Sequence, residues 1–167
     1  MALLAATACT SPTTTEHETP PTVAQAAPGQ ARAAAAEVCR RFTTVALGVD
    51  ATRDLSPAEA RQRAAHRYGT PTLAEQLAGH GHDPTWALLV RHDAHIEVHT
   101  EPVSDDPPPV RGDSVGAAVT ATRTALGPRG WTQRLPEVVV YCSLVRTSDT
   151  WRVTAVTVSD TTTGAQQ

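Results

Sequence analysis

The spacing of apolar residues changes from a helical to a strand period near the middle of the chain, at about Gly81. Before this point, apolar side chains recur every three or four residues, which is the repeat of an amphipathic helix. After it, they alternate with polar side chains, which is the repeat of a strand with one buried face. Helices followed by a series of strands are typical of an α+β domain with an antiparallel sheet.

Three helices are expected before this change. The first covers about residues 31–49, where the apolar stripe is formed by Ala31, Ala34, Ala35, Val38, Phe42, Val45, Ala46 and Val49. The second begins at Ser56-Pro57-Ala58-Glu59, which combines a cap residue, a first-turn proline and the glutamate of a capping box. It ends at Gly69, and a short third helix begins at Thr70-Pro71 and ends at Gly79.

Four antiparallel strands are expected after the change. The first runs from Trp86 to Val98, as one long strand or as two with a kink near His92. Its apolar parity is formed by Trp86, Leu88, Val90, Ala94, Ile96 and Val98. The other strands cover about residues 115–126, 135–146 and 151–158, and turn-forming residues separate them. The expected fold is a long first helix packed across a curved four-stranded sheet, which gives a cone with an open mouth.

A lone cysteine, Cys9, follows the small-residue run Leu3-Leu4-Ala5-Ala6-Thr7-Ala8. This pattern is similar to the end of a bacterial lipoprotein signal peptide, in which the cysteine receives the lipid. A complete signal has a basic segment and about 7–15 apolar residues, and the run is shorter than that. Either the true start lies upstream of Met1, or the segment is an ordinary disordered terminus.

The domain organisation follows from these patterns. We interpret residues 1–9 as a truncated signal segment, 10–30 as a disordered Thr/Pro-rich linker, 31–160 as the folded domain and 161–167 as a disordered tail. The expected location is extracytoplasmic, with a lipid anchor in the cell membrane.

Two further cysteines, Cys39 and Cys142, remain when Cys9 is assigned to a lipid. An oxidising compartment would favour a disulfide between them. Such a bond closes a loop of about 100 residues, worth about 4.7 kcal/mol in the chain-entropy model. The alternative is a pair of buried thiols that act as small hydrophobic side chains.

The charge of the chain does not favour nucleic-acid binding, which usually requires a strongly basic face. The formal net charge is −3, and the 14 basic residues are arginines scattered along the chain. Past residue 30, no apolar run approaches the length of about 18 residues that spans a bilayer.

The histidines of the first strand do not make a convincing metal site. His95, Glu97 and His99 would point to one side of a strand. Strand residues four positions apart are separated by roughly 13 Å, however, so His95 and His99 cannot bind one ion without a bend. No metal and no cofactor is therefore expected.

No acid–base pair can be identified from spacing. The candidate groups are Asp93, Glu97, Glu137, His92, His66 and Tyr68. Of the candidates on the expected strands, only His92 lies among the alternating apolar residues. A single histidine in such a position is more often a core residue than a catalytic one. His92, Tyr68 and Trp86 are the candidate pocket residues, and an enzyme is less expected than a non-catalytic protein.

The chain resembles the nuclear transport factor 2-like superfamily, and within it the bacterial branch found outside the cytoplasm. The resemblance covers about residues 31–160 and is carried by the first helix ending near Val49, the segment Asp54-Leu55-Ser56-Pro57-Ala58-Glu59-Ala60-Arg61, the Thr70-Pro71 helix, Gly130-Trp131, and Trp151-Arg152-Val153. That branch includes scaffold domains of conjugation and type IV secretion systems.

The resemblance implies a membrane-tethered accessory lipoprotein that acts as a protein–protein adaptor in a bacterial cell-envelope assembly, such as a conjugation or secretion apparatus. Its partner would be an envelope protein, and self-association stays open. The alternative is a small apolar ligand carrier, or an isomerase- or dehydratase-like enzyme that uses the cone. Ketosteroid isomerase, which has an Asp base and an apolar oxyanion site, shares the cone shape.

Overall fold

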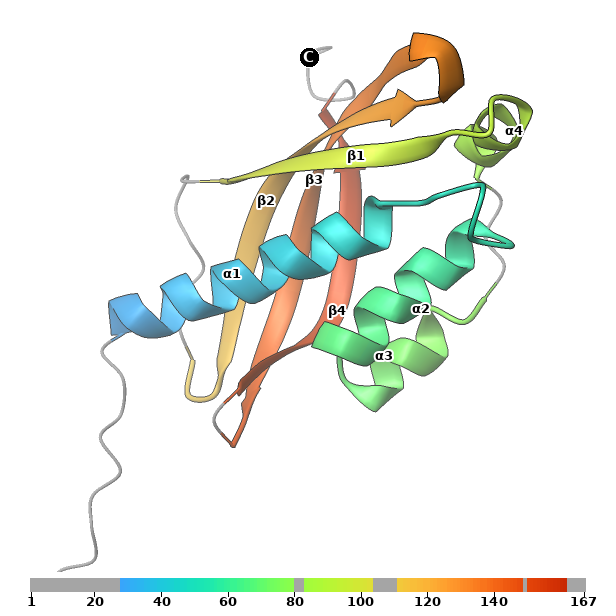
Figure 1. The fold of residues 1–167 in the computed structure, drawn as a ribbon. Coiled ribbons are helices and arrows are strands. Elements are labelled where there is room, and N and C mark those ends of the chain that lie inside the picture. Colours follow the sequence, from blue (N-terminus) through green and yellow to red (C-terminus); the bar gives the residue numbers. More distant parts are fainter. Residues whose placement is uncertain (1–27, 80–82, 104–110, 149, 162–167) are drawn as a thin grey trace, which may run out of the picture.

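The computed structural model describes residues 28–79, 83–103, 111–148 and 150–161 (Figure 1). Cys9, the expected signal segment, most of the expected linker and all but the first residue of the expected tail lie outside these ranges. His80 and His82 also lie outside them. The first helix begins at Pro28, so the last three residues of the expected linker are helical.

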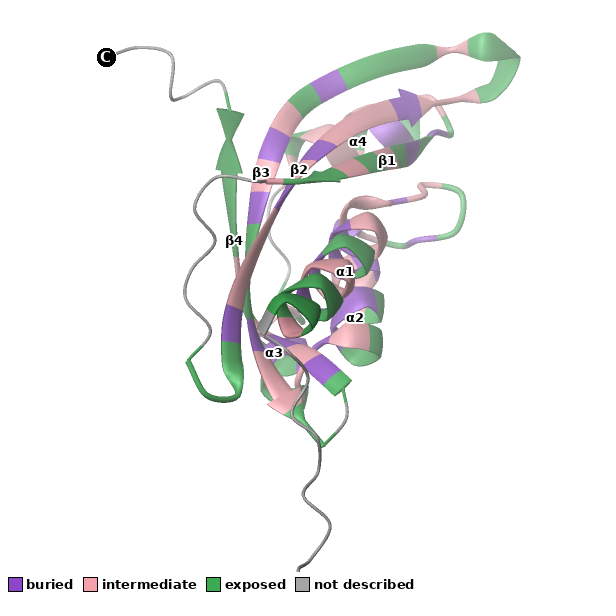
Figure 2. Cartoon of the chain, turned by 90° about the vertical axis from the view of Figure 1, so that its left-hand side faces the viewer, coloured by how far each residue is buried: buried purple, intermediate pink, exposed green. Residues whose placement is uncertain are grey.

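The described residues form an α+β fold, as predicted. The elements are α1 (Pro28–Leu47), α2 (Pro57–Tyr68), α3 (Pro71–Gln76), α4 (Pro84–Arg91), β1 (His95–Pro102), β2 (Ser114–Leu126), a short 3-10 turn (Pro128–Gly130), β3 (Thr132–Thr147) and β4 (Thr150–Asp160). The strands make one antiparallel sheet in the order β1-β2-β3-β4. Figure 2 shows the curved sheet from the side, with the helices gathered on one face.

The long helix α1 lies across the concave face of the sheet and contacts all four strands (Figure 1). Its buried stripe includes Ala35, Cys39, Phe42 and Ala46, which follow the predicted helical spacing. They pack against β-sheet residues and against α2 and α3 in one large apolar cluster. A disulfide bond joins Cys39 of α1 to Cys142 of β3. The fold thus fastens its first helix to the centre of its sheet.

The helix α4 occupies the place where the sequence predicts the first half of a long strand. Asp83 is its N-cap, with a side chain that accepts a hydrogen bond from the backbone N–H of Thr85 at 2.9 Å, and Pro84 follows. The helix buries Leu89 and leaves Val90 exposed, whereas the strand parity predicts the reverse. The prediction of a strand from Trp86 was wrong because short apolar runs fit both periods. The first strand begins at His95.

A second, smaller core cluster lies at the α4 end of the molecule. Leu89 of α4, Ile96 of β1, Ala125 of β2 and Leu135 of β3 are buried in it, with Trp86 and Trp131 packed against them. The β2–β3 register shifts between Ala121 and Arg123, which is a bulge of the kind that bends a sheet. The bulge separates the part of the sheet that packs in the larger cluster from the part that packs in the smaller one. The bend there allows both clusters to lie on the same concave side of the sheet.

Candidate functional site

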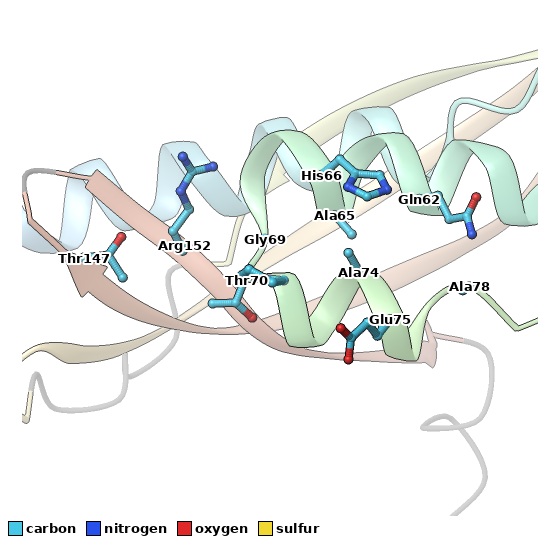
Figure 3. A pocket seen from close by; sticks show the side chains of 11 residues that line it. Gln62, Ala65, His66, Gly69, Thr70, Ala74, Glu75, Ala78, Thr147 and Arg152 are labelled. Carbon is cyan, nitrogen blue, oxygen red and sulfur yellow. The ribbon is translucent and has the colours of Figure 1, made fainter.

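A surface groove of about 620 Å³ lies between α2, α3 and the start of β4 (Figure 3). Its apolar lining consists of small residues: Ala65, Gly69, Pro71, Ala74 and Ala78. Its polar lining consists of Gln62, His66, Thr70, Glu75, Thr147 and Arg152. A strip of small apolar residues edged by hydrogen-bonding groups suits an extended or helical segment of another chain.

The groove exists because the α2–α3 turn is fixed to the sheet. Gly69 forms a parallel bridge with Val153 of β4. The backbone N–H of Thr70 donates to the carbonyl of Val153 at 2.9 Å. The hydroxyl of Thr70 caps α3 by accepting from the backbone N–H of Leu73. A side chain on Gly69 would place its Cβ 2.8 Å from the carbonyl oxygen of Ala65, so the turn admits no larger residue without a shift.

Arg152 anchors one end of the groove. Its Nη1 donates to the carbonyl of Arg67, at the end of α2, at 2.7 Å. The guanidinium of Arg67 in turn lies 5.4 Å from the centre of the Tyr68 ring. Glu75 of α3 lies farther along the groove, across from His66 of α2 (Figure 3). A bound segment would therefore meet a basic group at one end and a carboxylate at the other.

The start of α2 is built from a satisfied network of charges. The sequence predicts a capping box, but Ser56 makes no side-chain cap, and Glu59 accepts from the backbone N–H of Leu55 at 3.0 Å instead. Asp54 lies beside a cavity of about 470 Å³ and is paired with Arg63, which raises the pKa of that arginine. Because these groups already bind one another, this cavity offers little to a ligand.

The structure places the predicted pocket residues in different parts of the molecule. Tyr68 packs against the large core cluster. Trp86 packs against the smaller one. His92 lines a separate cavity with Trp131. None of the three lines the groove.

The acid–base candidates do not converge either. Asp93 lines the same cavity as His92. Glu97 is exposed on β1. Glu137 accepts a hydrogen bond from the hydroxyl of Thr122 at 3.2 Å. His66, which the sequence offers as a candidate on α2, is the one that lines the groove.

The described residues show neither a group of metal ligands nor a membrane-spanning helix. Among the described residues, no three His, Cys, Asp or Glu side chains are grouped to hold a metal ion. Within the same ranges, no helix has both the length and the apolar character to cross a bilayer.

Sequence reasoning missed the groove because its residues come from four elements, α2, α3, β3 and β4. Gln62 and Glu75 belong to two helices, and Thr147 and Arg152 flank the β3–β4 turn. The available signal was the small residues on two closely connected helices and just after the second one, Ala65, Ala74 and Ala78. Small side chains there keep the helical hairpin open at its surface.

No protein-family model matches the chain, and no curated protein matches it. Solved structures, by contrast, match its fold. An IcmL-like type IV secretion system protein from Legionella pneumophila is 11% identical, with a TM-score of 0.57 over 77% of this chain and 92% of its own. The VirB8 protein of Agrobacterium tumefaciens is 12% identical, with a TM-score of 0.52 over 78% of this chain and 93% of its own.

A third structure is an NTF2-like protein with a cystatin-like fold from Novosphingobium aromaticivorans. It is 14% identical, with a TM-score of 0.46 over 79% of this chain and 82% of its own. At these identities the likeness concerns the fold. The chain therefore shares the architecture of the IcmL-like and VirB8 structures across nearly their whole described length.

Proposed function

We propose that this chain is a non-catalytic adaptor domain of a bacterial cell-envelope assembly, and that it holds a segment of a partner protein in the groove between α2, α3 and β4. The observation that carries the proposal is the fold shared with two proteins of type IV secretion systems at TM-scores above 0.5. Fold alone does not determine function, so the proposal also depends on the groove.

The packing of the fold's interior favours binding of a protein partner over binding of a small ligand. Phe42, Leu144 and Val153 are fully buried between α1 and the sheet, where a cone-shaped binding protein would hold its ligand. The groove lies outside this core, on an open surface. Its small apolar strip and opposite end charges match a peptide segment whose acidic side chain meets Arg152 and whose basic side chain meets Glu75.

The proposal includes a location outside the cytoplasm and a lipid on Cys9. The disulfide between Cys39 and Cys142 supports an oxidising compartment, because such bonds are rare where thiols are kept reduced. Cys9 lies outside the described residues, so the lipid anchor depends on the sequence pattern. A diacylated cysteine would hold the domain at a membrane face, near envelope partners.

Site-specific photo-crosslinking in intact cells tests the groove. A photoreactive residue is placed at Gln62 or Glu75, and at Arg32 or Glu97 as matched exposed controls outside the groove lining. We expect one envelope protein to be captured from the groove positions and not from the controls. The groove-filling variant Ala78→Trp should remove this adduct while leaving the melting temperature of the domain unchanged.

The crosslinking result has a clear contrary outcome. Equal capture from groove and control positions, or an adduct that survives Ala78→Trp, would show that the groove is not the docking site. Capture of a cytoplasmic protein alone would contradict the envelope location.

A separate measurement tests the anchor. Cells are labelled with a radioactive fatty acid, and wild type is compared with Cys9→Ala. Label in the wild type alone, together with release of the variant from the membrane fraction, supports lipidation. Equal labelling of the two proteins contradicts it.

A further inference from the structure

A cavity of about 460 Å³ lies between the end of α4 and the β2–β3 turn, and shares no residue with the groove. One side is formed by Arg91, His92 and Asp93, and the other by Pro128, Arg129, Gly130 and Trp131. Figure 1 shows α4 and the β2–β3 turn at the same end of the molecule. Nothing in the proposed adaptor function uses this site.

The two sides of the cavity are held rigidly together. The imidazole of His92 stacks on the indole of Trp131, with ring centroids 4.1 Å apart and planes 7° from parallel. Gly127 lies so close to α4 that a Cβ there would be 2.8 Å from the carbonyl oxygen of His92. Its N–H donates to the carbonyl of Trp131 at 2.8 Å. The cavity is therefore formed before any ligand arrives.

Both turns contain backbone strain at the cavity. Asp93 has φ of 46° and Arg129 has φ of 57°, in the left-handed region that L-residues with a Cβ rarely adopt. Among the described residues, Ser148 is the one other non-glycine residue with positive φ. Strain of this kind costs about 1–3 kcal/mol per residue and is often found where a fold positions functional groups.

The cavity contains hydrogen-bond donors that have no partner within the described part of the chain. The side chains of Arg91, Arg129, His92 and Trp131 take part in none of the hydrogen bonds or ion pairs there, and Asp93 does not pair with either arginine. Asp93 is the one carboxylate in the lining. Two guanidinium groups against one carboxylate leave the cavity with excess positive charge.

We propose that this cavity binds a phosphate group, held by Arg91 and Arg129. The planar guanidinium presents two parallel N–H groups to phosphate oxygens, and two arginines can neutralise one dianion. The volume exceeds that of phosphate alone and leaves room for the organic part of a phosphoester. Val90, beside Arg91, is 50% exposed, so the same phosphate chemistry could come from a lipid headgroup or from a soluble phosphomonoester.

The test uses the full chain and four probes: inorganic phosphate, glycerol 3-phosphate, neutral phosphatidylcholine vesicles, and the same vesicles containing phosphatidylglycerol. Binding of the soluble probes is followed by the NMR signal of the Trp131 indole N–H, and vesicle binding by co-sedimentation. The test variant is Arg91→Gln/Arg129→Gln. The control Arg32→Gln/Arg61→Gln removes the same charge from α1 and α2, outside the cavity lining.

We expect saturable binding of a phosphate probe, weakened roughly tenfold to a hundredfold in the test variant and unchanged in the control, as for lost charge-assisted hydrogen bonds. Loss of the soluble probes identifies a phosphomonoester site, and loss of the phosphatidylglycerol vesicles alone identifies a headgroup site. Arg91→Lys keeps the positive charge but loses the planar guanidinium, so it should weaken binding as well. This single variant replaces the double variant if the double variant is unstable.

Three results would overturn the proposal. The wild type could bind none of the four probes. The control could lose as much binding as the test variant, which would indicate general charge attraction. Arg91→Lys and the double variant could both bind as the wild type does.

Discussion

Arg63 of α2 donates from both terminal nitrogens to the carboxylate of Asp54, which lies in the loop between α1 and α2. The Asp54 side chain is 3% exposed and that of Arg63 is 49% exposed. Oδ2 of Asp54 also accepts from the backbone N–H of Asp50 at 2.9 Å. This ion pair connects α2, the first helix of the α2–α3 hairpin, to the loop that follows α1.

We predict that Arg63→Ala lowers the free energy of unfolding by about 1–3 kcal/mol, because it leaves the buried Asp54 carboxylate without its cation. Arg53→Ala is the control, since Arg53 is 84% exposed and lies 3.6 Å from Asp50. An exposed pair of this kind contributes less than about 1 kcal/mol. Urea denaturation of both variants measures the difference, and equal losses would contradict the role given to Asp54.

Removal of the disulfide should cost much of the domain's stability. Cys39 and Cys142 are 103 residues apart in sequence, so the bond restricts a long loop of the unfolded chain. We expect Cys39→Ala/Cys142→Ala to lower the free energy of unfolding by about 2–4 kcal/mol. Denaturation of the wild type with and without reductant is the companion measurement, and a double variant as stable as the oxidised protein would contradict this.

The hydroxyl of Thr43 is fully buried and has no hydrogen-bond partner among the described residues. Thr43→Val keeps the shape of the side chain and removes the desolvated hydroxyl. We therefore expect stability to rise by about 1 kcal/mol. In Thr44, by contrast, the hydroxyl donates to the carbonyl of Arg40 at 3.0 Å, so Thr44→Val should give no gain. Thermal melts that show a loss at Thr43 would point to a partner for its hydroxyl.

The acid dependence of α1 follows from Glu37. Hydrogen bonds from Arg40, and then from Arg41, lower the pKa of this carboxyl to about 2. A carboxyl with a lowered pKa stabilises the fold above its unfolded value of about 4.5, and this contribution is lost as the pH falls towards 2. The side chain is 39% exposed, so solvent screening limits the gain to less than about 1 kcal/mol.

The measurement is a comparison of Glu37→Gln with wild type at pH 7 and at pH 2. We expect the variant to be less stable at pH 7 and nearly equal at pH 2, where the wild-type carboxyl is itself becoming protonated. Glu75→Gln, on the exposed face of α3, is the control, because Glu75 makes no ion pair with an arginine among the described residues. A stability difference that is the same at both pH values would contradict the role of the arginines.

The order of helices and strands could be predicted because each long element has a clear period. The stripe of α1 through Phe42 and the alternation of β3 through Val140 each satisfy one period over several turns or pleats. The segment from Trp86 to Val90 is too short to separate the two periods. Its N-cap Asp83 and the proline after it were the stronger signal, since they begin a helix locally.

The candidate sites were harder to predict because they depend on tertiary packing. His92 was expected inside a cone, but it ends α4 and lies against Trp131, which is 39 residues away in the chain. Arg91 and Arg129 line the same cavity from two turns that are distant in sequence. A period shows which face of an element is buried, and it carries no information about which turns come together.

The bond between α1 and β3 also determines how the domain would carry a mechanical load. A pull on the chain ahead of α1 could peel away the residues before Cys39, but at that point the tension would pass through a covalent link into an interior strand. Strand β3 has neighbours on both sides, so the force would be shared across the sheet. A domain held by its amino-terminal end could therefore bear traction without unravelling from that end.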